Sequence, residues 1–200
     1  MVIKKFLYVI LFLLLTSVSV FCEEYTDEEI FDIKQNGLAL YNTNHIEEAR
    51  IMLNKIPNGK KDSEVYLILA NIEEDKNNYD KALEYLKISI SKDSAFYKGY
   101  YNLGCIFMKK KIYTLAIDNF ELAVKYNKNN PFGFYNLGCA YLGINEFRKA
   151  KKNFLKALYL KNDEKDFYYN LAYANKKSGN EKQARKIIDF YNMTFIEKAN

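Results

Sequence analysis

Residue types that commonly carry out catalysis are sparse in this 200-residue chain. It has a single histidine, His45, and neither a nucleophile nor a metal-binding cluster accompanies it. The acidic run over residues 73–75 is interpreted as a solvated helix face, because carboxylates on helix surfaces cannot be paired from the sequence alone. The sequence therefore predicts no enzyme activity, no metal site and no cofactor.

Two consecutive stretches, residues 97–130 and 131–164, match each other at a spacing of 34 residues. A fixed period with large and small residues in phase is the signature of a stacked helical repeat. Within each stretch, apolar residues spaced three and four apart predict two helices. The short polar segment over residues 110–113 predicts the turn of an antiparallel helix pair.

These stretches resemble the tetratricopeptide repeat, which alternates aromatic, leucine, glycine and alanine residues at seven fixed positions. Both stretches match at all seven. The matching residues are Tyr100, Leu103, Gly104, Phe107, Ala116, Phe120 and Ala123 in the first stretch, and Phe134, Leu137, Gly138, Tyr141, Ala150, Phe154 and Ala157 in the second. The resemblance implies helix–turn–helix units that stack in one dimension.

Steps of about 34 residues extend the array in both directions. The outer units match less well, as terminal repeats often do because they lack a neighbour on one side. The departures from the pattern are Asn36, Glu73, Ser89, Asn175 and Tyr191. We therefore expect an all-α, α-α superhelical solenoid of five units over residues 30–62, 63–96, 97–130, 131–164 and 165–198, preceded by a linker over residues 23–29.

The resemblance implies that the first helix of each unit lines a concave groove. One groove position carries tyrosine in three successive units, each followed by asparagine; the pairs are Tyr101 with Asn102, Tyr135 with Asn136, and Tyr169 with Asn170. A tyrosine row offers apolar area and hydroxyls to an extended peptide or a partner helix. Tyrosine and asparagine are also common there in the family, and the chain has 18 tyrosines, so a structural role stays open.

Cys105 and Cys139 occupy the same position in neighbouring units. Stacked helices lie about 8–10 Å apart, whereas a disulfide needs Cα atoms within about 7 Å of each other. We expect two small, partly buried thiols and no bridge.

Residues 1–22 resemble a secretory signal peptide. Lys4 and Lys5 precede an apolar run over residues 6–15, and an acidic segment follows. The apolar stretch is shorter than the about 20 residues that span a membrane. Cleavage falls before Glu23 or before Val20, or Cys22 is the lipidated first residue of a bacterial lipoprotein. We predict export to the periplasm or the secreted space, with membrane attachment only through lipidated Cys22 or a retained leader.

The net charge of the chain excludes few classes of binding partner by itself. It is +5, and setting aside the two leader lysines leaves 28 basic and 25 acidic residues. The lysines look scattered along the chain, so no nucleic-acid partner is expected. We predict a non-enzymatic scaffold that binds a protein or peptide in its groove. The alternative is a structural module that self-assembles, as a homo-oligomer, through the apolar residues of its last helix; these are Ile187, Ile188, Phe190, Tyr191, Phe195 and Ile196.

Overall fold

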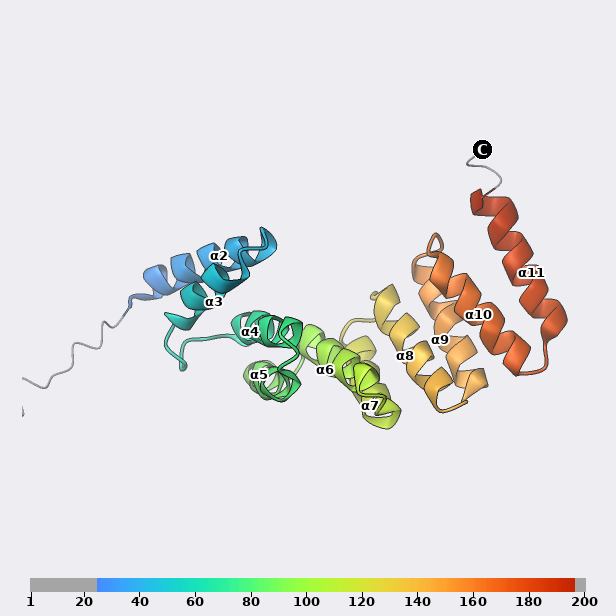
Figure 1. The fold of residues 1–200 in the computed structure, drawn as a ribbon, viewed down its shortest axis with the longest axis horizontal. Helices are drawn as coiled ribbons and strands as arrows, with labels where there is room; N and C mark the ends of the chain where they lie inside the picture. Colours follow the sequence, from blue (N-terminus) through green and yellow to red (C-terminus); the bar gives the residue numbers. More distant parts are fainter. Residues whose placement is uncertain (1–24, 197–200) are drawn as a thin grey trace, which may run out of the picture. The chain divides into compact units, whose positions relative to one another are not determined.

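A computed structural model describes residues 25–196 of the chain (Figure 1). These residues form ten α-helices and one π-helical turn, η1 (Asn192–Ile196), and they contain no strand. The expected all-α fold class is confirmed. The predicted signal peptide, including Cys22, lies outside the described residues. No helix among residues 25–196 is long and apolar enough to cross a membrane.

The chain divides into two compact units, Met1–Lys60 and Lys61–Asn200. In the first unit, α2 (Asp27–Asn42) pairs with α3 (Ile46–Asn54). The repeat phase predicts a linker up to residue 29, but α2 begins earlier because a capping box starts it. Thr26 Oγ1 accepts a hydrogen bond from the Glu29 backbone N–H at 3.2 Å, and Glu29 Oε2 accepts one from the Thr26 N–H at 2.8 Å. The acidic first turn also suits the helix dipole.

The second unit consists of four antiparallel helix pairs that pack one against the next (Figure 1). The first helices begin 34 residues apart. The pairs are α4 (Ser63–Asp75) with α5 (Tyr79–Lys92), α6 (Tyr97–Lys109) with α7 (Tyr113–Tyr126), α8 (Pro131–Gly143) with α9 (Phe147–Leu160), and α10 (Lys165–Lys177) with α11 (Glu181–Tyr191).

A residue with left-handed backbone geometry closes the turn of every pair. In the second unit these residues are 34 apart: Asn77, Lys111, Asn145 and Gly179, with φ of 60°, 58°, 61° and 82°. Asparagine and glycine adopt this conformation at low cost, and lysine is the exception. The turn position is thus as periodic as the apolar pattern, although it carries no apolar residue.

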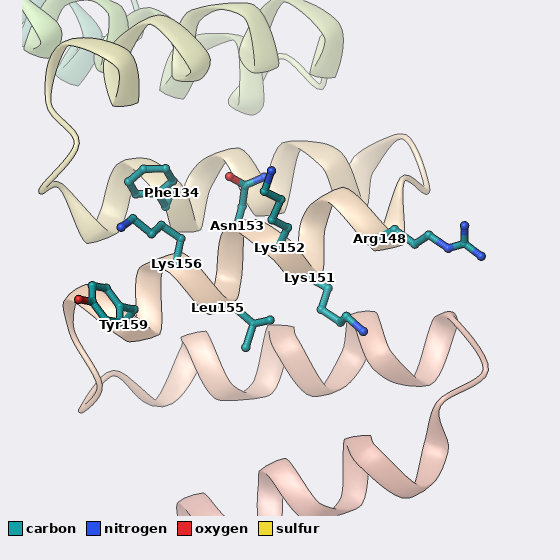
Figure 2. A pocket seen from close by; sticks show the side chains of 8 residues that line it. All are labelled: Phe134, Arg148, Lys151, Lys152, Asn153, Leu155, Lys156 and Tyr159. Carbon is teal, nitrogen blue, oxygen red and sulfur yellow. The ribbon is translucent and has the colours of Figure 1, made fainter.

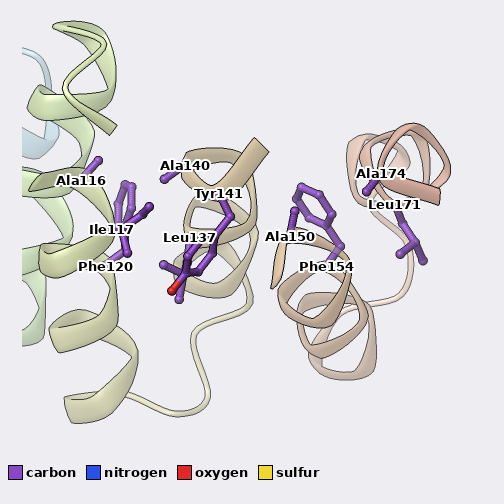
Figure 3. Packing of buried hydrophobic residues seen from close by; sticks show 10 residues of the cluster. All are labelled: Ala116, Ile117, Phe120, Leu137, Ala140, Tyr141, Ala150, Phe154, Leu171 and Ala174. Carbon is purple, nitrogen blue, oxygen red and sulfur yellow. The ribbon is translucent and has the colours of Figure 1, made fainter. Parts of the chain in front are cut away.

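The core alternates large and small side chains across each helix pair. Phe120 and Phe154 are fully buried and lie against Gly104 and Gly138, the small residues of the preceding helices. Figure 3 shows Phe154 on α9 beside Ala150, with Leu137 on α8 and Leu171 on α10 in the same cluster. The glycines let the paired helices approach closely, and the aromatic rings fill the space that they leave.

Polar residues that depart from the repeat pattern are accommodated by hydrogen bonds. Glu73 is 5% exposed and accepts hydrogen bonds from Asn78 at 2.9 Å and from Lys81 at 3.1 Å. Burial alone would raise the pKa of Glu73, but these two donors lower it. Ser89 is fully buried and donates to the Ser63 carbonyl at 2.7 Å. Glu73 and Ser89 therefore stay buried without leaving an unpaired polar group.

The aromatic residues near the end of the described chain pack mainly on one another. Tyr191 is buried, with its ring 5.2 Å from that of Tyr168 and 5.3 Å from that of Phe195. Phe190 and Met193 remain 55% and 61% exposed. The sequence suggests docking through the apolar residues of the last helix. Part of that apolar surface is covered by α10 and η1.

Candidate functional site

The tyrosines and asparagines singled out in the sequence meet across successive units. Asn136 on α8 donates to the Tyr101 hydroxyl on α6 at 2.8 Å, and Asn170 on α10 donates to the Tyr135 hydroxyl on α8 at 2.7 Å. Asn102 donates instead to Asn71 on α4 at 2.6 Å. Each asparagine therefore links its helix to the preceding first helix, in a ladder that runs from α4 to α10.

The rings of the first two tyrosines contribute to packing. The Tyr101 ring centroid lies 5.8 Å from that of Phe120. The Tyr135 ring lies 5.7 Å from Phe154 and stacks 4.7 Å from Phe167. Burial raises the pKa of Tyr101 to about 12 and also raises that of Tyr135. Both hydroxyls are therefore protonated at neutral pH, and both rings are partly enclosed.

Tyr169 differs from the other two because it is 41% exposed. Among the described residues its hydroxyl has no hydrogen-bond partner; its ring meets the edge of Tyr191 at 6.1 Å, and Lys165 lies 5.2 Å above it. Nearby Tyr173 is 47% exposed. Together they border an open hollow of about 410 Å³ between α10 and α11, lined also by Ala172, Lys176, Ala184, Arg185, Ile188 and Asp189.

Tyr173 is an exposed residue near Tyr169 that the predicted tyrosine row does not include. It occupies the position in its unit that Cys105 and Cys139 occupy in theirs, one helical turn after the tyrosine of the row. We call the residues at these two positions the groove face; they are Tyr101, Cys105, Tyr135, Cys139, Tyr169 and Tyr173. The exposed aromatic area of the groove face is concentrated on α10.

Cys105 and Cys139 are free and half-buried. The amide nitrogens of Asn136 and Asn170 lie 4.0 and 3.7 Å from their sulfurs. Burial is the main cause that raises the pKa of each thiol to about 11. Because the thiolate is the reactive form, both cysteines are poor nucleophiles in this setting.

We expect iodoacetamide to modify Cys105 and Cys139 slowly in the folded chain. A pKa of about 11 in place of the ordinary 9.0 lowers the thiolate fraction near pH 8 by about 100-fold. The higher intrinsic nucleophilicity of a more basic thiolate offsets part of this loss. Peptide mass spectrometry over time, with and without guanidinium, measures both rates. Equal rates in the folded and unfolded chain would contradict the assigned burial.

The single histidine, His45, has no catalytic or metal-binding partner among the described residues. His45 lies in the turn before α3, exposed, with Nδ1 3.0 Å from the Thr43 hydroxyl. Across residues 25–196, no group of histidine, cysteine and carboxylate side chains is arranged to hold a metal ion.

Comparison with known proteins identifies the repeats. A sequence model described as "Tetratricopeptide repeat" matches residues 63–91, 97–130 and 133–164. None of the curated proteins matches the chain in sequence. Solved structures named MamA are similar in fold. One spans residue 41 to the end of MamA from Desulfovibrio magneticus RS-1, with a TM-score of 0.75, 20% identity, and coverage of 88% of this chain and 98% of that one.

Two further MamA structures resemble the chain to a similar degree. MamA AMB-1 has a TM-score of 0.72 at 20% identity and covers 87% of this chain and 98% of its own. MamA MSR-1 has a TM-score of 0.69 at 23% identity, with 84% and 97% covered. At these identities the likeness establishes the solenoid fold of helix pairs.

Proposed function

Because the chain carries tetratricopeptide repeats within residues 63–164, we propose that it is a protein-interaction scaffold whose groove face binds an extended peptide or a partner helix. The observation that carries this proposal is the pair of exposed tyrosines, Tyr169 and Tyr173, at one end of a row whose other members are held in place. Tyrosine provides large contact area and a polar tip, and it loses little conformational freedom on binding.

The asparagine ladder supports binding by making the groove face rigid. The hydrogen bonds from Asn136 to Tyr101 and from Asn170 to Tyr135 hold α6, α8 and α10 at a set spacing. A partner that binds such a surface does not have to order it first, which favours affinity. The Tyr169 hydroxyl can accept a hydrogen bond from a partner amide, as the Tyr135 hydroxyl accepts one from Asn170.

Site-specific crosslinking tests the groove face. With benzoylphenylalanine in place of Tyr169 or Tyr173, we expect a crosslinked product of one defined mass in cells of the host. The matched control is Leu115 on the outer side of α7, which is 42% exposed and is not part of the groove face. The same product from position 115, or no product from positions 169 and 173, would contradict the proposal. Alanine at Tyr101 or Tyr135 is less informative because it would also remove core contacts.

We also propose that the scaffold acts outside the cytoplasm. The support is the sequence of residues 1–22, in which two lysines precede an apolar run and small residues follow it. The intact mass of the protein from the envelope and secreted fractions should correspond to a chain beginning at Val20 or Glu23, or at an acylated Cys22. A full-length mass that includes Met1, found in the cytosolic fraction, would overturn export.

A further inference from the structure

Helix α9 has an unusual charge for its place in the repeat. Residues 147–160 include five basic side chains and no acidic one. The equivalent second helices α5, α7 and α11 have net charges of +1, −1 and +1. The lysines are expected to be scattered along the sequence, and for the fourth repeat that expectation is wrong, because residues 148–156 include five basic side chains and no acidic one. The repeat fold itself does not require this charge, since its neighbours lack it.

Four of these cations border a hollow of about 670 Å³ on α9, to which α8 contributes Phe134 (Figure 2). Leu155 and Tyr159 supply apolar surface and are 51% and 82% exposed. Lys156 lies 4.9 Å from the Tyr159 ring centroid and 5.9 Å from that of Phe134. We call this surface the α9 basic hollow; its residues are Phe134, Arg148, Lys151, Lys152, Asn153, Leu155, Lys156 and Tyr159.

The charge has no counterpart nearby. Among the described residues, no carboxylate forms an ion pair with Arg148, Lys151, Lys152 or Lys156; on α9 only Lys149 approaches one, Glu146, at 3.8 Å. Arg148 and Lys152, and Lys152 and Lys156, are like charges four residues apart, an arrangement that destabilises a helix. Basic side chains in the first turn also oppose the helix dipole. This helix departs from local stability rules, and the contacts of its cations inside the described chain are limited to the Lys149–Glu146 pair and to lysines near aromatic rings. Such a departure is typical of a functional surface.

We propose that the α9 basic hollow binds an acidic segment of a partner protein that places an apolar side chain against Phe134, Leu155 and Tyr159. Charge complementarity selects an acidic partner. A polypeptide fits better than a lipid surface, because the exposed Leu155 and Tyr159 border a hollow of about 670 Å³ that can receive one side chain of a peptide. A nucleic acid would need the positive surface to continue onto α7 and α11, where the charges are mixed. This site uses no residue of the groove face.

The test compares two triple variants of the full chain by fluorescence anisotropy, with a labelled peptide of alternating glutamate and phenylalanine as the probe. We expect R148Q/K152Q/K156Q to weaken binding at least about tenfold. The control K87Q/K125Q/K186Q removes the same charge from exposed positions on α5, α7 and α11, and it should leave binding unchanged. Added salt should weaken binding to the unmodified chain, and a peptide with glutamine for glutamate should not bind.

Three results would overturn the proposal. An equal loss in both triple variants would show that only net charge matters. Tighter binding of phosphatidylglycerol vesicles or of oligothymidylate, lost in the α9 variant, would assign the surface to a membrane or to a nucleic acid. Absence of peptide binding to the unmodified chain would remove the site. The α9 variant relieves like-charge contacts and loses the approach of Lys156 to two rings, so its melting temperature should stay about the same. A loss of binding with unchanged melting is then not due to unfolding.

Discussion

Replacing Phe154 with alanine is expected to lower the free energy of unfolding by about 3–5 kcal/mol. The Phe154 ring is fully buried, contacts Gly138 on α8, and lies 5.7 Å from the Tyr135 ring. It also shares a core cluster with Leu171 of the next pair. Its removal would leave a cavity between two repeats, and neighbouring helices close such cavities only in part. Guanidinium denaturation followed by circular dichroism measures the loss.

The adjacent residue provides the control for this substitution. Leu155 lies on the same helix and is 51% exposed, so Leu155→Ala should change the free energy of unfolding by no more than about 0.5 kcal/mol. A loss at Leu155 similar to that at Phe154 would mean that the two side chains are not buried as described. A broad transition for the Phe154 variant would indicate that the fourth pair unfolds separately from its neighbours.

The core of the second unit follows directly from the sequence, because the repeat places each residue size at the same point of every helix pair. Phe120 and Phe154 are fully buried at positions where the pattern requires an aromatic residue. The repeat period does not predict where α2 starts, since the start depends on a local cap. The cap is nevertheless readable from Thr26 and Glu29, three residues apart at the front of an acidic turn.

The candidate site is less predictable, because its members come from different repeats. The sequence leaves open whether Tyr101 and Tyr135 bind a partner or have a structural role. In the structure each hydroxyl accepts a hydrogen bond from an asparagine 35 residues later. Such a contact depends on how successive helices are spaced, which no single repeat encodes. The α9 basic hollow is a different case. Its cations lie close together in the sequence, with Lys151 next to Lys152, but the near-balance of charge over the whole chain conceals them, and only the structure shows that they border one hollow.

Gly138→Ala is expected to destabilise the chain by up to about 2 kcal/mol, although alanine is the better helix former. A Cβ atom at residue 138 would lie 2.6 Å from Cε1 of Phe154. This buried ring is confined on all sides, so it cannot move away without disturbing the core. Overpacking of this kind costs about 1–3 kcal/mol, and the gain in helix propensity offsets about 1 kcal/mol of it. Gly59→Ala is the control, since no atom lies within 4 Å of the added carbon.

A second substitution should relieve the overpacking that Gly138→Ala causes. The helix pair α4 and α5 already combines alanine with leucine at the equivalent positions. On α4 and α5 the equivalent residues are Ala70 and Leu86, both buried in one cluster. Gly138→Ala together with Phe154→Leu recreates that pair on α8 and α9. We expect the double variant to be more stable, by about 1 kcal/mol, than the sum of the single losses predicts. Additive losses in denaturant titrations would show that the glycine serves a purpose other than making room for the ring.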